Sequence, residues 1–427
     1  MIALAACVLL LALLALGSPI AFALIIASAA GLYLIGGSTL VIGLIGTTTL
    51  SAGSNYELLA VPMFILMAEF ITVSRIADDL FDAATVWVGR LPGGLGVATV
   101  LGGSLFGAIS GSTTAAAVTL SSTSLPAMVD RGYSPKFAGG IVVVTGTLDM
   151  LIPPSIALVF FGLVADVSIG KLLIAGVIPG IVVAIVLVGY IMTIAILRPH
   201  RVPPGQPYSF SEKIRVLKST GPIMSLFALI TGCLYTGIAT PTEVSAVGAI
   251  GAMIIAVLKR RLTFSIIVTA LTKATQTSCM IGFMLLGSYI FSQFFTLTRT
   301  TQALGEWILA LHSSPYVILS ALGLFYLVLG TFLDTIAMII LTVPIVLPVI
   351  IRLGYDPVWY GIMMIMMAQL GILTPPTGIN VYIVAKYANR PVHEIFAGVF
   401  PYIFLIIGVM VIFTIWPEIV LWLPSRM

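Results

Sequence analysis

Hydrophobic residues in this chain form long runs that recur from one end of the sequence to the other. A membrane-spanning helix needs roughly 20 apolar residues, and the runs of suitable length are 1–16, 18–35, 59–74, 171–197, 219–235, 236–258, 278–296 and 395–423. The longest polar stretch, Arg198 to Thr220, is too short to bury a hydrophobic core of its own. The pattern therefore predicts an all-α polytopic membrane protein.

Two stretches, 93–130 and 315–352, each offer two half-length apolar helices without a charged connector. The first turns at Ser110-Gly111-Ser112 and the second around Gly330-Thr331. Non-helical backbone at membrane depth must line a cavity or be buried in protein. We therefore expect two re-entrant helical hairpins.

Other segments also depart from a simple span. Segments 137–165 and 357–385 are apolar but are interrupted by Pro-Pro, which predicts broken helices because proline removes a backbone donor. Segments 75–90 and 263–277 are amphipathic and are expected to lie along an interface or to act as arms. Residues 36–52 are compatible either with spanning the bilayer or with lying flat.

An internal repeat has a constant offset of 222 residues. Every proline between Thr113 and Pro179 recurs at this offset without a gap, and the pairs are Pro126/Pro348, Pro135/Pro357, Pro153/Pro375, Pro154/Pro376 and Pro179/Pro401. Apolar bias alone would align leucines and valines, but it would not align every proline. The chain therefore contains two structural repeats.

Charge predicts the orientation of these repeats. The connection 198–218 is strongly basic and should be cytoplasmic; its charged residues are Arg198, Arg201, Lys213, Arg215, Lys218 and Glu212. Counting spans from it places Arg131 and Lys136 on the same side, so the first hairpin opens toward the cytoplasm and the second toward the outside. Five crossings separate the hairpins, an odd number, which predicts inverted repeats.

The predicted organisation has four parts. Residues 1–92 form scaffold spans and an arm, and 93–197 form the first transport repeat. Residues 198–314 form the cytoplasmic loop, further scaffold spans and a second arm, and 315–427 form the second repeat and a C-terminal span. We interpret Met1 to Leu16 as a membrane segment, with a cleaved signal peptide as the alternative; the segment lacks the basic n-region of such a peptide.

Each repeat pairs a hairpin tip with a helix break. Carbonyls and hydroxyls gathered there suit a small hard cation, whereas the N-termini of half-helices suit an anionic solute. Such residues in membrane helices often serve only packing, but a repeated cluster at breaks favours a site. The candidate cation ligands are Ser110, Gly111, Ser112, Gly146, Thr147, Pro153, Gly330, Thr331, Asp334, Pro375 and Thr377, and the candidate solute contacts are Ser112, Thr113, Thr335, Gln369 and Asn380.

Four acids are expected within membrane depth, without an obvious Lys or Arg partner inside a span: Glu69, Asp149, Glu243 and Asp334. An ionised Asp at the bilayer centre costs about 2.5–3.5 kcal/mol, so a bound cation or a proton should offset the charge of Asp334. Glu69 and Glu243 lie near segment ends, where scaffold hydrogen bonding is an equal alternative. Asp149 suits either a ligand or a group facing an aqueous cavity.

Composition excludes several classes of function. Only 8% of residues are charged, against about 25% in soluble domains, and the cations form no patch interleaved with aromatic residues for nucleic acid. His200, His312 and His393 are isolated, and no Gly-rich loop with a Lys could hold ATP. We expect neither an enzyme nor a bound cofactor.

Several motifs together resemble the large membrane subunit of tripartite ATP-independent periplasmic (TRAP) transporters. These are Val61–Glu69, Ile109–Ser112, Pro126–Met128, Arg131–Tyr133, Gly146–Thr147, Ile152–Ser155, Ala239–Glu243, Gly330–Thr331, Asp334–Thr335 and Pro375–Gly378. The resemblance implies sodium-driven, elevator-like uptake of an organic acid across the bacterial inner membrane. It also implies a small integral membrane subunit and a periplasmic binding protein as partners, and sodium sites at the hairpin tips and helix breaks.

The sequence departs from this family at two places. Asp149 stands where a small residue is expected, and Val118 to Ser124 is unusually rich in hydroxyls; an unusual solute or coupling ion would account for either. One alternative is a stand-alone ion-coupled carrier of the dicarboxylate type. Another is a channel or a pure scaffold subunit.

Overall fold

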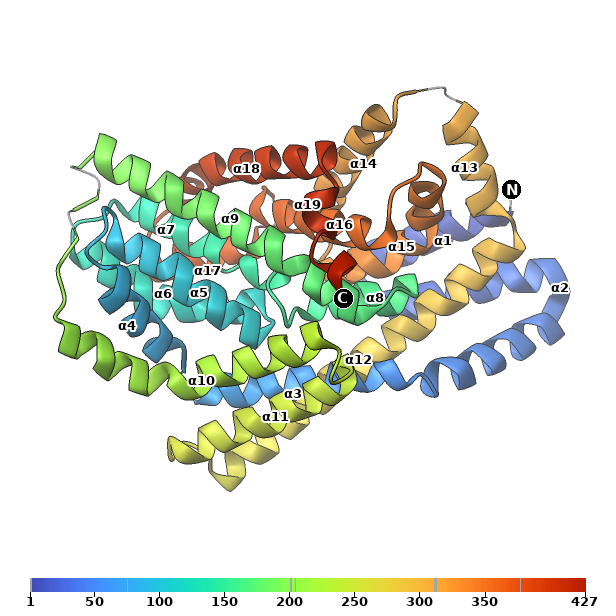
Figure 1. The fold of residues 1–427 in the computed structure, drawn as a ribbon. Coiled ribbons are helices and arrows are strands. Elements are labelled where there is room, and N and C mark those ends of the chain that lie inside the picture. Colours follow the sequence, from blue (N-terminus) through green and yellow to red (C-terminus); the bar gives the residue numbers. More distant parts are fainter. Residues whose placement is uncertain (1, 75, 200–201, 204, 311–312, 377) are drawn as a thin grey trace.

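The computed structural model describes residues 2–74, 76–199, 202–203, 205–310, 313–376 and 378–427. All regular secondary structure in this part of the chain is helical (Figure 1). Seven helices are long and apolar enough to cross a membrane, by length and composition: Ile20–Gly53, Ile169–Leu197, Phe210–Thr236, Pro241–Leu258, Phe264–Leu297, Thr335–Arg352 and Val392–Ile415. The prediction of an all-α polytopic membrane protein is confirmed.

Both predicted hairpins are present. The first consists of α5 (Gly94–Ser110) and α6 (Thr113–Asp130), and the second of α14 (Pro315–Gly330) and α15 (Thr335–Arg352). The first turn is tight because Gly111 has a φ of 56°, in the left-handed region that favours glycine. The second turn is longer and occupies residues 331–334.

Both broken spans are present as well. The first consists of α7 (Pro135–Thr145), the short η2 (Leu148–Met150) and α8 (Ile156–Ala165). The second consists of α16 (Pro357–Leu373) and α17 (Ile379–Ala388). The Pro-Pro pairs predicted to break the helices lie in the connections, because proline in a helix interior removes a hydrogen bond and clashes with the preceding turn.

The two repeats are interwoven. Helix α7 of the first repeat packs on α18 (Val392–Ile415) of the second, and its counterpart α16 packs on α9 (Ile169–Leu197) of the first. Gly140 makes the first contact possible, because a Cβ there would lie 2.5 Å from the carbonyl oxygen of Gly398. The repeats therefore share one packed core.

The remaining helices surround this core. They are α1 (Ile2–Ala15), α2 (Ile20–Gly53), α3 (Ala60–Val73), α4 (Ile76–Val88), α10 (Phe210–Thr236), α11 (Pro241–Leu258), α12 (Phe264–Leu297), α13 (Thr300–Ala310) and α19 (Glu418–Leu421), with short 3-10 turns η1 (Tyr56–Leu59) and η3 (Pro424–Arg426). Helix α2 packs along α12, and α3 packs along α11.

Three helix boundaries differ from the predictions. Segment 263–277 is not a separate arm, because α12 runs unbroken through it into the predicted span 278–296. Residues 36–52 continue α2 beyond a kink at Gly36 and Gly37. Helix α11 begins at Pro241 rather than at 236, because Gly237 ends α10 in a left-handed conformation.

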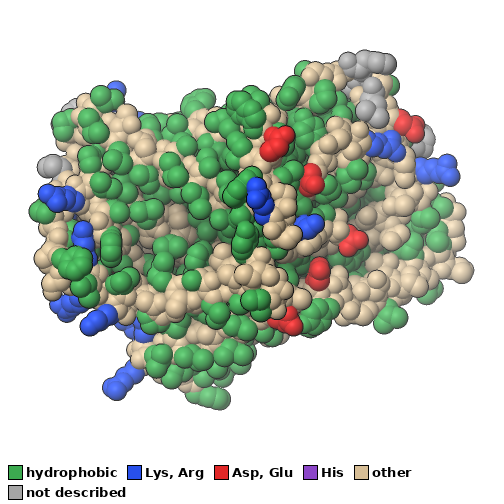
Figure 2. All heavy atoms as spheres, viewed as in Figure 1, with side chains coloured by type: hydrophobic (Ala, Val, Ile, Leu, Met, Phe, Trp, Pro, Cys, Tyr) green, Lys and Arg blue, Asp and Glu red, His purple; other side chains and the backbone are tan. Residues whose placement is uncertain are grey.

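The surface has an apolar middle and a polarised charge distribution. Figure 2 shows hydrophobic side chains spread across the visible face; many of the visible Lys and Arg lie toward the left end, others lie in the right half, and the visible acids lie in the right half. In Figure 1 the left end carries the connection between α9 and α10 and the open end of the first hairpin, while α14 and α15 lie on the right. This grouping agrees with the predicted placement of Arg131, Lys136 and the basic connection on one side.

Candidate functional site

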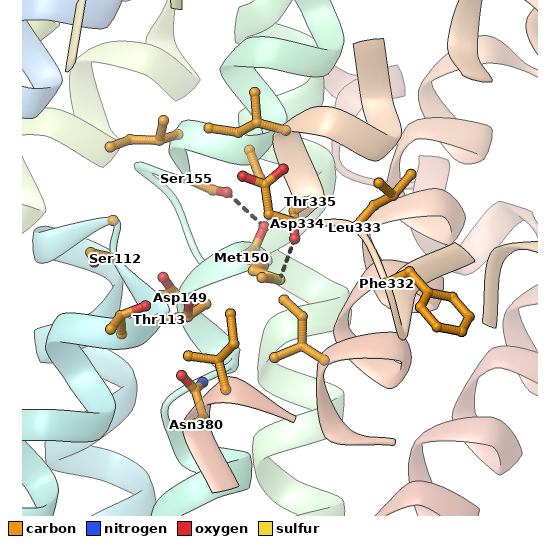
Figure 3. Close-up of a pocket in the computed structure, with 18 residues that line it drawn as sticks. Ser112, Thr113, Asp149, Met150, Ser155, Phe332, Leu333, Asp334, Thr335 and Asn380 are labelled. Carbon is orange, nitrogen blue, oxygen red and sulfur yellow. Dashed lines mark hydrogen bonds between the residues drawn. The ribbon is translucent and has the colours of Figure 1, made fainter. Parts of the chain in front are cut away.

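A pocket of about 270 Å³ lies where the hairpin tips meet the helix breaks. Its walls come from both repeats, and Figure 3 shows the first hairpin tip and the second on opposite sides of it. The lining residues are Gly111, Ser112, Thr113, Thr114, Asp149, Met150, Ser155, Ile156, Ala157, Gly330, Phe332, Leu333, Asp334, Thr335, Ile336, Ile372, Ile379 and Asn380. No Lys, Arg or His is among these described residues.

The first turns of four helices face this pocket. The lining includes two residues from the start of each helix, namely Thr113 and Thr114 of α6, Ile156 and Ala157 of α8, Thr335 and Ile336 of α15, and Ile379 and Asn380 of α17. A helix N-terminus carries about half a positive elementary charge and unsatisfied backbone N–H groups. Their convergence brings partial positive charge to the pocket without a basic side chain, which suits an anionic group, and the same wall carries the carboxylates of Asp149 and Asp334.

Side chains at these N-termini fix the local backbone. Ser112 accepts a hydrogen bond from the Ala115 backbone at 3.2 Å, and Ser155 accepts one from Leu158 at 3.3 Å. Among the described residues no side chain caps helix α17, which Gly378 precedes with a φ of 38°.

The predicted site residues divide into those that line the pocket and those that do not. The pocket includes Gly111, Ser112, Thr113, Gly330, Asp334, Thr335 and Asn380. Its lining does not include Ser110, Gly146, Thr147, Pro153, Thr331, Gln369 or Pro375. Thr377 lies outside the described residues. The cation-binding and solute-binding roles stay predictions.

Several residues outside the lining have local partners. The Ser110 hydroxyl donates to the Gly107 carbonyl at 3.3 Å, and the Thr331 hydroxyl donates to that of Val328 at 2.7 Å. Pro153 faces an apolar groove between α4, α5, α9 and α10 instead.

Thr147 and Gln369 are repeat counterparts that touch one another. They are 222 positions apart, and the Gln369 amide Nε2 donates to the Thr147 hydroxyl at 2.9 Å. Both side chains are fully buried. A contact between equivalent residues must lie on the axis that relates the two repeats, so this bond joins the repeats at their centre.

Asp334 caps a helix. Its carboxylate Oδ1 accepts a hydrogen bond from the Ala337 backbone at 2.6 Å, and the residue is exposed. The N-terminus of α15 thus stabilises the negative charge. Asp334 also lies in the pocket wall, and the expectation that a bound cation or a proton offsets its charge stays a prediction.

Two of the other acids also have structural partners. The Glu69 carboxylate pairs with Lys273 of α12 at 3.5 Å, which corrects the expectation that it has no basic partner. Glu243 forms a capping box with Thr240 at the start of α11. The Thr240 backbone N–H and hydroxyl both donate to the Glu243 carboxylate. Scaffold hydrogen bonding, one of the two alternatives for these acids, matches both contacts.

Asp149 is the acid that differs. Its side chain is 2% exposed, it lies in η2 at the first helix break, and its Oδ1 has no hydrogen-bond partner among the described residues. Asn380 is 1% exposed and its Nδ2 likewise has none. Figure 3 places Asp149 between Thr113 and Asn380, across the pocket from Leu333 and Thr335. In the sequence, the polarity of Asp149 and its position near the Pro-Pro break were the only signals that it lies in the pocket.

Comparisons with known proteins agree on one family. Residues 7–419 match the model of the tripartite ATP-independent periplasmic transporter, DctM component. The C4-dicarboxylate TRAP transporter large permease protein DctM of Pseudomonas aeruginosa is 32% identical over 87% of this chain and 87% of its own length. The sialic acid TRAP transporter large permease protein SiaM of Vibrio cholerae is 32% identical over 97% of this chain and 96% of its own.

A solved structure shares the fold. The YdaH transporter of Alcanivorax borkumensis superposes with a TM-score of 0.63 at 16% identity, covering 89% of this chain and 88% of that one. At this identity the likeness concerns the fold alone. It agrees with the all-α polytopic architecture.

Proposed function

This chain belongs to the family of the DctM component of TRAP transporters, and on that premise we propose that it carries a small organic carboxylate, driven by sodium, across the bacterial inner membrane. As a large permease of this family it is a secondary transporter and not an enzyme. In the proposal it works with a small integral membrane subunit and a periplasmic binding protein. Sodium and solute enter together, as in a symporter.

One observation supports the carboxylate part of the proposal. The pocket between the repeats is lined by the first turns of four helices and, among the described residues, by no basic side chain. Backbone N–H groups at helix N-termini bind carboxylates well. A site built this way holds an anion without a permanent positive charge, so the anion can also leave.

The position of the pocket supports alternating access. The pocket lies between two repeats of similar construction, and the scaffold helices pack outside their core. We propose that the hairpins and broken spans move as a unit against the scaffold in an elevator-like motion. Solute and sodium would then be carried in the pocket rather than through a fixed channel.

Asp334 allows the sodium part to be tested separately from folding. Asn caps helices about as well as Asp, so Asp334→Asn should retain the fold of α15 while removing a charge from the pocket wall. Proteoliposomes containing the chain and its two partners should accumulate solute in response to a sodium gradient and without ATP. In Asp334→Asn the half-saturating sodium concentration should rise, because a carboxylate binds a cation more strongly than an amide does.

A matched control is available in Asp356. This residue also caps a helix, accepting from the Val358 backbone at 2.7 Å, but it does not line the pocket. Asp356→Asn should leave the sodium dependence unchanged. Equal sodium dependence in all three proteins would remove Asp334 from the ion site, and uptake driven equally well by a proton gradient without sodium would refute sodium coupling.

A further inference from the structure

The pocket combines the first turns of four helices with one buried acidic side chain, Asp149. Asp149 lines the pocket, is 2% exposed and has an Oδ1 without a hydrogen-bond partner among the described residues. No Lys, Arg or His lines the described wall of the pocket. A buried carboxylate oxygen without a partner is costly, and a charged or hydrogen-bonding ligand removes that cost.

Asp149 belongs to only one of the two repeats. Its counterpart at the 222-residue offset is Gly371. At Gly371 a Cβ would lie 2.5 Å from the Cα of Gly330, so the backbones leave no room for a side chain there. In the first repeat Gly107 provides that room, because a Cβ on it would lie 2.9 Å from the Cβ of Asp149. Asp149 is therefore a difference between two repeats that otherwise share their backbone frame of hairpin and broken span.

A solute with carboxylates alone fits this pocket poorly. Its anionic group would be attracted by the four helix N-termini, but Asp149 would repel it in a region that is shielded from water. A solute that also carries a positive group resolves the conflict, because each end then meets an opposite charge. Asn380, whose Nδ2 has no partner among the described residues, supplies a further donor for the carboxylate end.

We propose that the transported acid is zwitterionic, with an ammonium or amidinium group paired with Asp149 and a carboxylate held at the helix first turns. This proposal rests on the proposed function and narrows it to one class of carboxylate. It assigns Asp149 to the solute rather than to the coupling ion.

The test measures direct binding, because a periplasmic binding protein would impose its own selectivity on uptake. The full chain in lipid nanodiscs with sodium is titrated with two matched pairs, succinate with β-alanine and glutarate with 4-aminobutyrate. Within each pair an ammonium group replaces one carboxylate on the same carbon chain. Binding is followed by thermal stabilisation and calorimetry.

The wild type should bind the amino acids more tightly than the dicarboxylates. Asp149→Asn should weaken binding of the amino acids about thirtyfold or more, as expected for loss of a buried charge pair, and should not weaken that of the dicarboxylates. The control is Asp166→Asn, at an exposed position outside the pocket lining with a φ of 54°, where Asn is well tolerated.

Four results would overturn the inference. Tighter binding of dicarboxylates by the wild type would refute the proposal of a zwitterionic solute and would leave the proposed carboxylate transport intact. Equal weakening of all four probes in Asp149→Asn would assign Asp149 to the frame. A change only in the half-saturating sodium concentration, measured by titrating sodium at fixed probe, would assign it to the ion. Binding of none of the four probes would reject the proposed carboxylate class together with the inference.

Discussion

The hydrogen bond between Thr147 and Gln369 offers a direct test of how the two repeats are held together. The Gln369 Nε2 donates to the Thr147 hydroxyl at 2.9 Å, and both side chains are fully buried. The Thr147 hydroxyl also donates to the Val144 carbonyl at 2.8 Å within its own repeat. Three variants separate these contacts: Thr147→Val, Gln369→Leu and the double mutant.

The expected magnitude follows from what each variant leaves behind. Thr147→Val strands the Gln369 amide in a buried position, which costs about 1–3 kcal/mol. Gln369→Leu removes the amide, including an Oε1 that has no partner among the described residues, so its cost should be smaller. The double-mutant cycle compares the effect of Thr147→Val in the wild type with its effect in Gln369→Leu. The loss of the Thr147 bond to Val144 occurs in both backgrounds and therefore cancels. The remaining coupling should be about 0.6–1.7 kcal/mol, the range measured between membrane helices.

The assay is the free energy of unfolding in bicelles for the wild type and the three variants. Thr99→Val is the control, because the buried Thr99 hydroxyl bonds the Leu95 carbonyl of its own helix. Combined with Gln369→Leu it should give an additive result. Additivity between Thr147→Val and Gln369→Leu, within about 0.3 kcal/mol, would refute the view that this bond links the repeats energetically.

Two further predictions concern packing and orientation. Gly371→Ala should lower the free energy of unfolding by about 1–3 kcal/mol, because its Cβ would lie 2.5 Å from the Cα of Gly330; Gly408→Ala, which meets nothing within 4 Å, should be neutral, and an equal effect of the two would contradict the close approach. In a variant without the native cysteines, a cysteine near Arg215 should be labelled only from the cytoplasm and one near Tyr355 only from the periplasm; labelling of both from one side would end the inverted-repeat hypothesis.

The hairpins and helix breaks could be predicted because proline and glycine act locally. A Pro-Pro pair prevents a regular helix wherever it stands, so the breaks before α8 and α17 follow from the sequence. The same reasoning failed for α12. Its amphipathic half, 263–277, passes into its apolar half without a breaker residue, so the change in polarity marks a change of environment and not the end of a helix.

Contacts between distant segments were beyond local reasoning. The partner of Glu69 is Lys273, on a helix 204 residues further along the chain. Nearness to a hairpin tip or a helix break predicted Ser112, Thr113, Thr335 and Asn380 in one site. Nearness to a tip or a break does not predict the direction in which a side chain points from its helix. Gln369 was expected in the site, but it points to Thr147 at the repeat axis and does not line the pocket.

The repeats agree in their frame and differ in their chemistry, and this difference bears on what the pocket can hold. Prolines and glycines recur at the 222-residue offset, and Thr113 and Thr335 occupy equivalent places at the two tips. Two polar residues of the pocket have apolar counterparts: Asp149 corresponds to Gly371, and Asn380 corresponds to Leu158. A symmetric frame allows two similar inward-facing and outward-facing arrangements with little difference in packing. The proposed zwitterion has unlike ends and needs unlike partners, and in that proposal Asp149 and Asn380 provide them within the frame.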